Sequence, residues 1–120
     1  MTATGTTALL GVAADAALAV PGVAGLQPRL AHRLAAAATT RADPMPHRTS
    51  PEAGIRADRA PGSGWHIEVR CVLTEGRRAL DIARDVHDRV RTAVISHLSA
   101  PEPVTVTVTV TRIAARYDAA

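Results

Sequence analysis

Hydrophobic and polar residues alternate most clearly in the C-terminal half of the chain. From Trp65 to Leu73 the apolar residues recur at every second position, which predicts a strand with one buried face. Glu75-Gly76 then supplies a turn. From Ala79 to about Leu98 the apolar residues recur every three or four positions, which predicts an amphipathic helix. Valine and threonine alternate without exception from Val104 to Thr111, which predicts a closing strand.

The same periods predict which side chains face the core. The helix is expected to bury an apolar stripe against the sheet and to leave its Asp and Arg residues in solvent. The stripe predicted for the helix is Leu80, Ala83, Val86 or His87, Val90, Val94 and Leu98. One face of the first strand should hold Trp65, Ile67, Val69, Cys71 and Leu73, and the other should hold His66, Glu68, Arg70 and Val72.

A shorter helical pattern occupies the N-terminal segment. Thr6 and Thr7 are suited to cap a helix that runs to about Ala19, and Pro21-Gly22 would end it. Val23 to Leu26 follows as a short strand or an extended exit. Asp15 and the absence of a preceding basic residue favour a buried helix over a signal peptide or membrane span. Its predicted apolar face is Leu9, Val12, Ala13, Ala16, Ala17 and Val20.

The middle of the chain has no sustained period. Residues 29–38 could form a second, Ala-rich helix, and 39–64 is dense in Pro and Gly, which predicts a flexible loop. Gly54-Ile55 could start a short strand within it. The fold predicted for a single domain over 1–120 is therefore α+β. It has a small sheet of about three strands covered by two helices, in α-β-β-α-β order, with a disordered Pro/Arg-rich insertion.

Composition adds a thin core and a local positive charge. Hydrophobic residues make up 47% of the 120 residues, but many are alanine and Phe is absent, so burial against a partner or second copy would help stability. Every basic residue is arginine, as expected from a GC-rich, actinobacterial-like genome. The net charge of +3 arises in the middle segment. Its arginines are candidates for contact with an anionic surface: Arg29, Arg33, Arg41, Arg48, Arg56 and Arg59.

Groups able to carry chemistry are sparse and scattered. Cys71 is the single cysteine and lies in a predicted strand, which favours a buried, unreactive thiol. The five histidines show no paired ligand spacing. The sequence therefore predicts no catalytic residue, cofactor or metal. Gly22 to Gly25 matches the Gly-x-x-Gly loop of KH domains, so a KH-like nucleic-acid-binding module remains the alternative, although the interior of this loop is apolar.

The valine and threonine strand is the candidate interaction surface. Its unpaired backbone groups would template another chain if it lay at a sheet edge, and neither Lys nor Pro protects it. A central position in the sheet is the other interpretation, and the sequence leaves both open. The residues assigned to this interaction edge are Val104, Val106, Val108 and Val110.

Three segments together resemble the alkaline shock protein / general stress protein family of the bacterial envelope stress response. The first is the helix that ends in Val20-Pro21-Gly22-Val23. The second is the strand Ile67–Leu73 with its Glu75-Gly76 turn, followed by Ile82–Val86 and Val90 on the helix. The third is the closing Val104–Val108 strand, which is similar to the family's Val-x-Val-x-Val pattern.

The resemblance implies a small, non-enzymatic α+β domain without cofactors. Such a protein would be cytoplasmic, and peripheral at the inner face of the cell membrane. Its partners would be itself and a membrane-anchored protein, with neither nucleic-acid binding nor direct insertion into the membrane. The expected function is structural: an interaction protein of cell-envelope homeostasis that acts by self-association and through the anchored partner.

Overall fold

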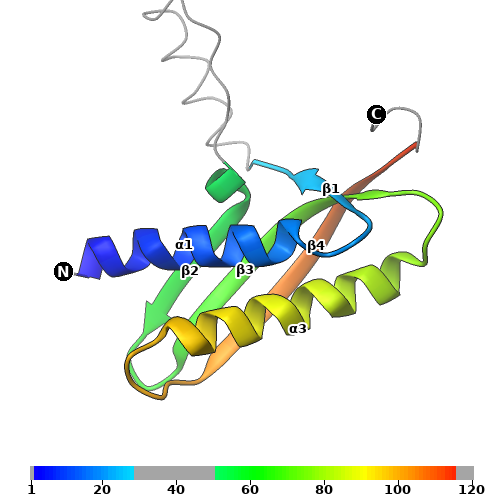
Figure 1. The fold of residues 1–120 in the computed structure, drawn as a ribbon. Helices are drawn as coiled ribbons and strands as arrows, with labels where there is room; N and C mark the ends of the chain where they lie inside the picture. The colour runs from blue at the N-terminus through cyan, green and yellow to red at the C-terminus, as the bar shows by residue number, and fades with distance from the viewer. Residues whose placement is uncertain (1, 29–50, 116–120) are drawn as a thin grey trace, which may run out of the picture.

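The computed structural model describes residues 2–28 and 51–115, and the predicted helix at 29–38 lies outside them. Two helices and four strands account for most of the described chain (Figure 1). The predicted α+β class is confirmed, with the order α-β-β-β-α-β. The elements are α1 (Thr2–Leu18), β1 (Val23–Leu26), the 3-10 turn η1 (Pro51–Gly54), β2 (Ile55–Ala60), β3 (Gly64–Thr74), α3 (Ala79–His97) and β4 (Val104–Ala114).

Strand β3 is the centre of the sheet. One of its edges pairs in parallel with β4 along almost its whole length, from Trp65 to Thr74. The other edge is shared by two short antiparallel strands, because β2 pairs with the first half of β3 and β1 with Cys71–Leu73. Long strands with partners on both edges are the most buried in a sheet, and Ile67, Val69 and Cys71 have no exposed surface.

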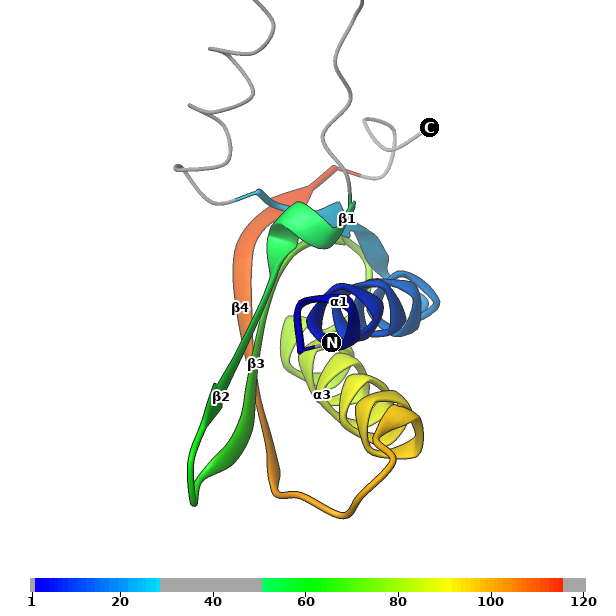
Figure 2. The ribbon, with the colours of Figure 1, turned by 90° about the vertical axis from the view of Figure 1, so that its left-hand side faces the viewer.

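The two helices cover one face of the sheet, and no helix of the described residues covers the other, which is called the open face below (Figure 2). Helix α3 packs on β4, whereas α1 packs on β2 and on α3. The predicted faces of β3 are confirmed: Ile67, Val69, Cys71 and Leu73 are buried, while His66 is exposed on the opposite face. A single core joins both helices to the sheet. Its members include Leu9, Ala13, Ala17, Val20, Ile55, Ile67, Val69, Leu73, Ile82, Val86, Val90, Val94, Val104 and Val106.

Helix α3 has the predicted bounds to within one residue, but its buried row begins at Ile82 instead of the predicted Leu80. The fully buried positions are Ile82, Val86, Val90 and Val94, spaced by four. Leu80 was expected on this face, and that is wrong: it is 60% exposed. The four buried residues are all β-branched, and a row spaced by four lies on one side of the helix. Leu80 lies outside that row, so its side chain remains in solvent.

Helix α1 begins earlier than predicted. It starts at Thr2, so Thr6 and Thr7 lie within its first half instead of capping it. The turn at Pro21-Gly22 ends it as expected, and β1 confirms the short strand that was predicted after the turn. Ala13 and Ala17 have no exposed surface. Their small side chains let α1 approach α3 closely, which explains how an Ala-rich helix contributes to the core.

Strand β2 corrects the predicted flexible loop at 39–64. Residues 39–50 lie outside the described part of the chain, but 51–60 forms η1 and β2, and β2 begins at the predicted Ile55. Ile55 and Ala57 turn toward the core, and Arg56 and Asp58 turn away from it. Only Ile55 is strongly apolar. The alternation was therefore too weak to recognise among the surrounding Pro and Gly residues.

Candidate functional site: the free edge of strand β4

Strand β4 lies at the edge of the sheet. It spans 11 residues and pairs only with β3 among the residues the structure describes. The sequence left open whether this strand lies at an edge or in the centre of the sheet, and the structure places it at an edge. An edge strand of this length presents a row of backbone donors and acceptors that can bind another strand.

The hydrogen-bond pattern shows which residues present those groups. The backbone N–H of Trp65 donates to the carbonyl oxygen of Pro103 at 2.8 Å, and Trp65 is in register with Val104. In a parallel ladder with this pattern, every second residue of β4 bonds to β3, and the residues between them point away. The residues bonded to β3 are Pro103, Thr105, Thr107 and Thr109. The outward N–H and C=O groups therefore belong to the residues assigned from sequence: Val104, Val106, Val108 and Val110.

The side chains of the same valines point into the molecule. Val104 and Val106 are each 7% exposed, and Val108 and Val110 pack against the core while remaining partly exposed. The predicted edge thus consists of valine backbone and not of valine side chains. On the open face, the exposed Thr107 Oγ1 lies 3.1 Å from Nε2 of His66, and Thr105 and Thr109 are exposed beside it.

Two features limit the regular part of the edge. Strand β4 begins at Val104, so the regular row of outward donors begins there. At the other end the register shifts, because Cys71 pairs with Val110 but Val72 pairs with Arg112. Thr111 is the additional residue, a β-bulge, and its Oγ1 donates to the carbonyl oxygen of Cys71 at 3.3 Å. The continuous edge is therefore Val104–Val110.

The predicted arginine surface is only partly described, and its described members are paired. Arg29, Arg33, Arg41 and Arg48 lie outside the described residues. Arg56 Nε lies 2.7 Å from Asp58, and Arg59 Nε lies 2.7 Å from Glu102. An acid beside each guanidinium offsets its charge, so these two residues do not form an unpaired basic patch.

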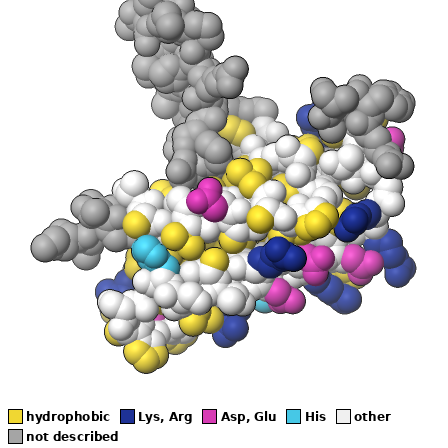
Figure 3. All heavy atoms as spheres, viewed as in Figure 1, with side chains coloured by type: hydrophobic (Ala, Val, Ile, Leu, Met, Phe, Trp, Pro, Cys, Tyr) yellow, Lys and Arg dark blue, Asp and Glu magenta, His cyan; other side chains and the backbone are white. Residues whose placement is uncertain are grey.

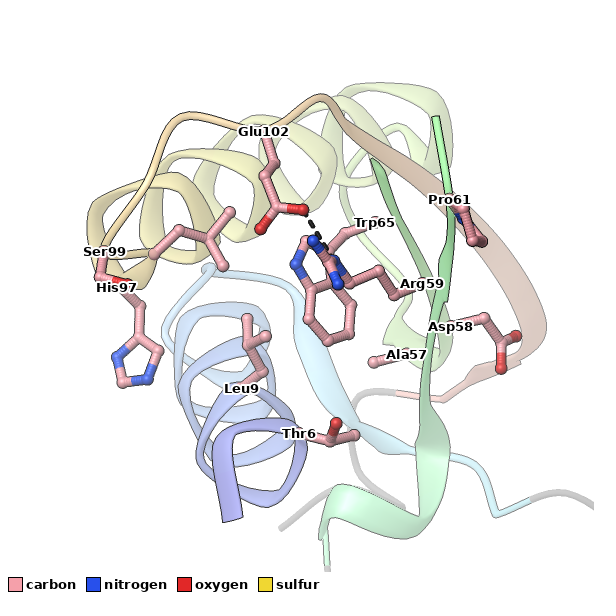
Figure 4. A pocket seen from close by; sticks show the side chains of 11 residues that line it. Thr6, Leu9, Ala57, Asp58, Arg59, Pro61, Trp65, His97, Ser99 and Glu102 are labelled. Carbon is pink, nitrogen blue, oxygen red and sulfur yellow. Dashed lines mark hydrogen bonds and ion pairs between the residues drawn. The ribbon is translucent and has the colours of Figure 1, made fainter. Parts of the chain in front are cut away.

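A hollow of about 600 Å³ lies at the end of the sheet near the β2–β3 turn (Figure 4). Leu9, Ala57 and Trp65 contribute apolar surface, and Arg59 and Glu102 point toward each other beside Trp65. The Trp65 Nε1 group is buried and has no hydrogen-bond partner among the described residues. Because Glu102 precedes β4, the ion pair ties the start of that strand to β2.

The remaining candidate groups are dispersed. Cys71 is fully buried, as predicted, and burial raises the pKa of its thiol, which disfavours the nucleophilic thiolate. Within 2–28 and 51–115 no three His, Cys, Asp or Glu side chains come together as a metal site. Gly22–Gly25 runs from a turn into β1, which pairs with β3. It does not form the loop between two helices that a KH domain requires.

The outer surface of the helices is mixed in character. Acidic and basic side chains lie side by side over the N-terminal part of α3, whereas α1 shows mainly apolar side chains (Figure 3). This confirms the solvent-facing charged side predicted for α3. No helix of the described chain is long and apolar enough to cross a membrane.

None of the protein-family models, curated proteins or solved structures compared with this chain matches it. The similarity to the alkaline shock protein family therefore rests on the residues quoted above and stays a prediction.

Proposed function

We propose that this protein is a non-enzymatic interaction protein of the bacterial envelope stress response. It acts through self-association and through a membrane-anchored partner at the inner face of the cell membrane, and the free edge of β4 is the surface that binds. The observation that carries the proposal is the edge Val104–Val110, which no other strand of residues 2–28 and 51–115 pairs with. Its outward backbone groups are continuous and the segment contains no charged residue.

Three observations support an interaction role for this edge. Natural edge strands are commonly kept short, charged or bulged, which discourages pairing with other chains. Strand β2, at the opposite edge, follows this rule: it has six residues and carries Arg56, Asp58 and Arg59. Strand β4 is longer, and between Pro103 and Thr111 it is neutral and regular. The contrast within one sheet favours β4 as the binding edge.

The envelope stress assignment comes from the resemblance and from the fold class that it implied. A small α+β domain with a closing Val-x-Val-x-Val strand is what the resemblance predicted, and the structure has this strand in parallel register beside β3. The KH-like alternative loses its main support, because the Gly22–Gly25 segment lies in a turn and a strand.

A proline at the outward position Val108 tests the role of the edge. Proline there removes an outward N–H and places its ring toward an incoming strand, while the bonds from Thr107 and Thr109 to β3 stay. We expect the Val108→Pro variant to weaken self-association by about tenfold or more, equivalent to about 1.4 kcal/mol. The measurement is molar mass by light scattering across a range of concentration, at low and moderate salt.

The matched control is Val108→Ala. It removes the same partly buried side chain but keeps the backbone N–H, so it separates loss of packing from loss of the edge donor. We expect this variant to weaken self-association much less than Val108→Pro does. Equal weakening in both variants, or a strict monomer before any substitution, would count against self-association through the β4 edge.

A further inference from the structure

We propose that the occupant of the β4 edge is β4 of a second copy, paired antiparallel about a two-fold axis at Thr107. The inference rests on the proposed function, because it names the partner, orientation and register at the same edge. Its result is a continuous sheet through both copies, with the helices of both on one face.

The register follows from the two ends of the edge. An antiparallel ladder exchanges two hydrogen bonds at each pair of residues whose backbone groups face each other. The start of β4 at Val104 limits the edge on one side and the bulge at Thr111 limits it on the other. All four outward valines find partners only when Val104 lies opposite Val110 of the second copy and Val106 lies opposite its Val108. This register gives about eight new hydrogen bonds.

Thr107 is the midpoint of that register. It lies opposite Thr107 of the second copy, and Thr105 lies opposite Thr109. Residues directly opposite in an antiparallel pair project to the same face of the sheet. The exposed threonines would therefore meet on the open face, and the valines would meet on the helix-covered face, where Val108 and Val110 are still partly exposed. Pairing would extend the apolar layer without bringing like charges together.

Other arrangements of the same edge fit less well. A two-fold axis that paired the two β4 strands in parallel would turn one copy over. The side chains of residues that face each other would then project to opposite faces of the sheet, whereas neighbouring residues in one pleated sheet project to the same face. Pairing β4 with the β2 edge of the next copy would be open-ended. It would also set the neutral edge against Arg56, Asp58 and Arg59. The antiparallel pair about a two-fold axis forms a closed dimer, in which both copies contribute the same surface.

Disulfide mapping tests the register directly. A non-hydrogen-bonded antiparallel pair has Cα atoms about 4.5 Å apart, within the roughly 4.4–6.8 Å range of disulfides. Thr107→Cys should form a cross-linked dimer under oxidised glutathione. Thr105→Cys and Thr109→Cys should each give at least about tenfold less, because like positions would be about 14 Å apart. An equal mixture of these two variants should cross-link to each other.

The unsubstituted chain is the control, because its single cysteine, Cys71, is fully buried and should not cross-link. Light scattering on the reduced proteins separates a failure of the proposed register from a failure of the proposed function. A dimer that Val108→Pro disrupts but that Thr107→Cys does not cross-link would overturn the register and leave the proposed function standing. A strict monomer would overturn both. Masses that keep growing with concentration would overturn the closed two-fold pair in favour of open-ended pairing.

Discussion

Gly64→Ala is expected to lower the free energy of unfolding by about 3 kcal/mol, because two costs combine at this position. Gly64 has φ 78°, where a residue with a Cβ is strained. A Cβ built there would also overlap the carbonyl oxygen of Pro103, which accepts the hydrogen bond from Trp65 that starts the β3–β4 ladder. Relief of the overlap requires movement of backbone. Chemical denaturation followed by Trp65 fluorescence measures the change.

Gly62 is the matched control for this substitution. It lies in the same β2–β3 connection with φ 82°, but nothing comes within 4 Å of an added Cβ. Gly62→Ala therefore carries only the conformational cost, and we expect a loss of about 1 kcal/mol. If the two variants were equally stable, the close packing of Gly64 on Pro103 would contribute nothing to the β3–β4 pairing.

Ile67→Ala is the second large effect that we expect, with a loss of about 3 kcal/mol. Ile67 is 0% exposed in the central strand, so truncation leaves a cavity in the core. Such a loss is a large part of the stability of a small domain, which is roughly 5–15 kcal/mol in total. The same denaturation experiment measures it.

Ile113→Ala is the matched control, because it truncates the same side chain as Ile67→Ala but at an exposed site. Ile113 lies in β4 beyond the bulge and is 55% exposed, so we expect its substitution to change stability by less than about 0.5 kcal/mol. A large loss here would contradict the assignment of Ile113 to the surface. A small loss at Ile67 would contradict the central position of β3.

The sequence predicted the elements whose period is strong. Strand β3, helix α3 and strand β4 each repeat over enough residues for the period to be read. Their order is confirmed, as are the faces of the two strands. Strand β2 was assigned largely to a loop, since it has one large apolar residue and depends on pairing with β3. Leu80 was misplaced because hydrophobicity alone does not tell which of two adjacent apolar rows contacts the sheet.

The candidate site was found only in part. Alternation in Val104–Val110 indicated the segment and its faces, but edge and central strands share that pattern. The outward direction of the valine backbone depends on the parallel register with β3, and the end of the edge depends on the bulge at Thr111. The end of the valine and threonine alternation at Thr111 was the sequence signal of that bulge. The pairing of Arg59 with Glu102 had no sequence signal, because 43 positions separate them.

The most direct test is residue-resolved amide hydrogen exchange across β4 at increasing protein concentration. The N–H groups of Thr105, Thr107 and Thr109 bond to β3 and should be protected at every concentration. Those of Val106 and Val108 should exchange rapidly in the monomer and become protected as the molar mass rises. Association without added protection at these valines would contradict the account, because the contact would then lie on another surface.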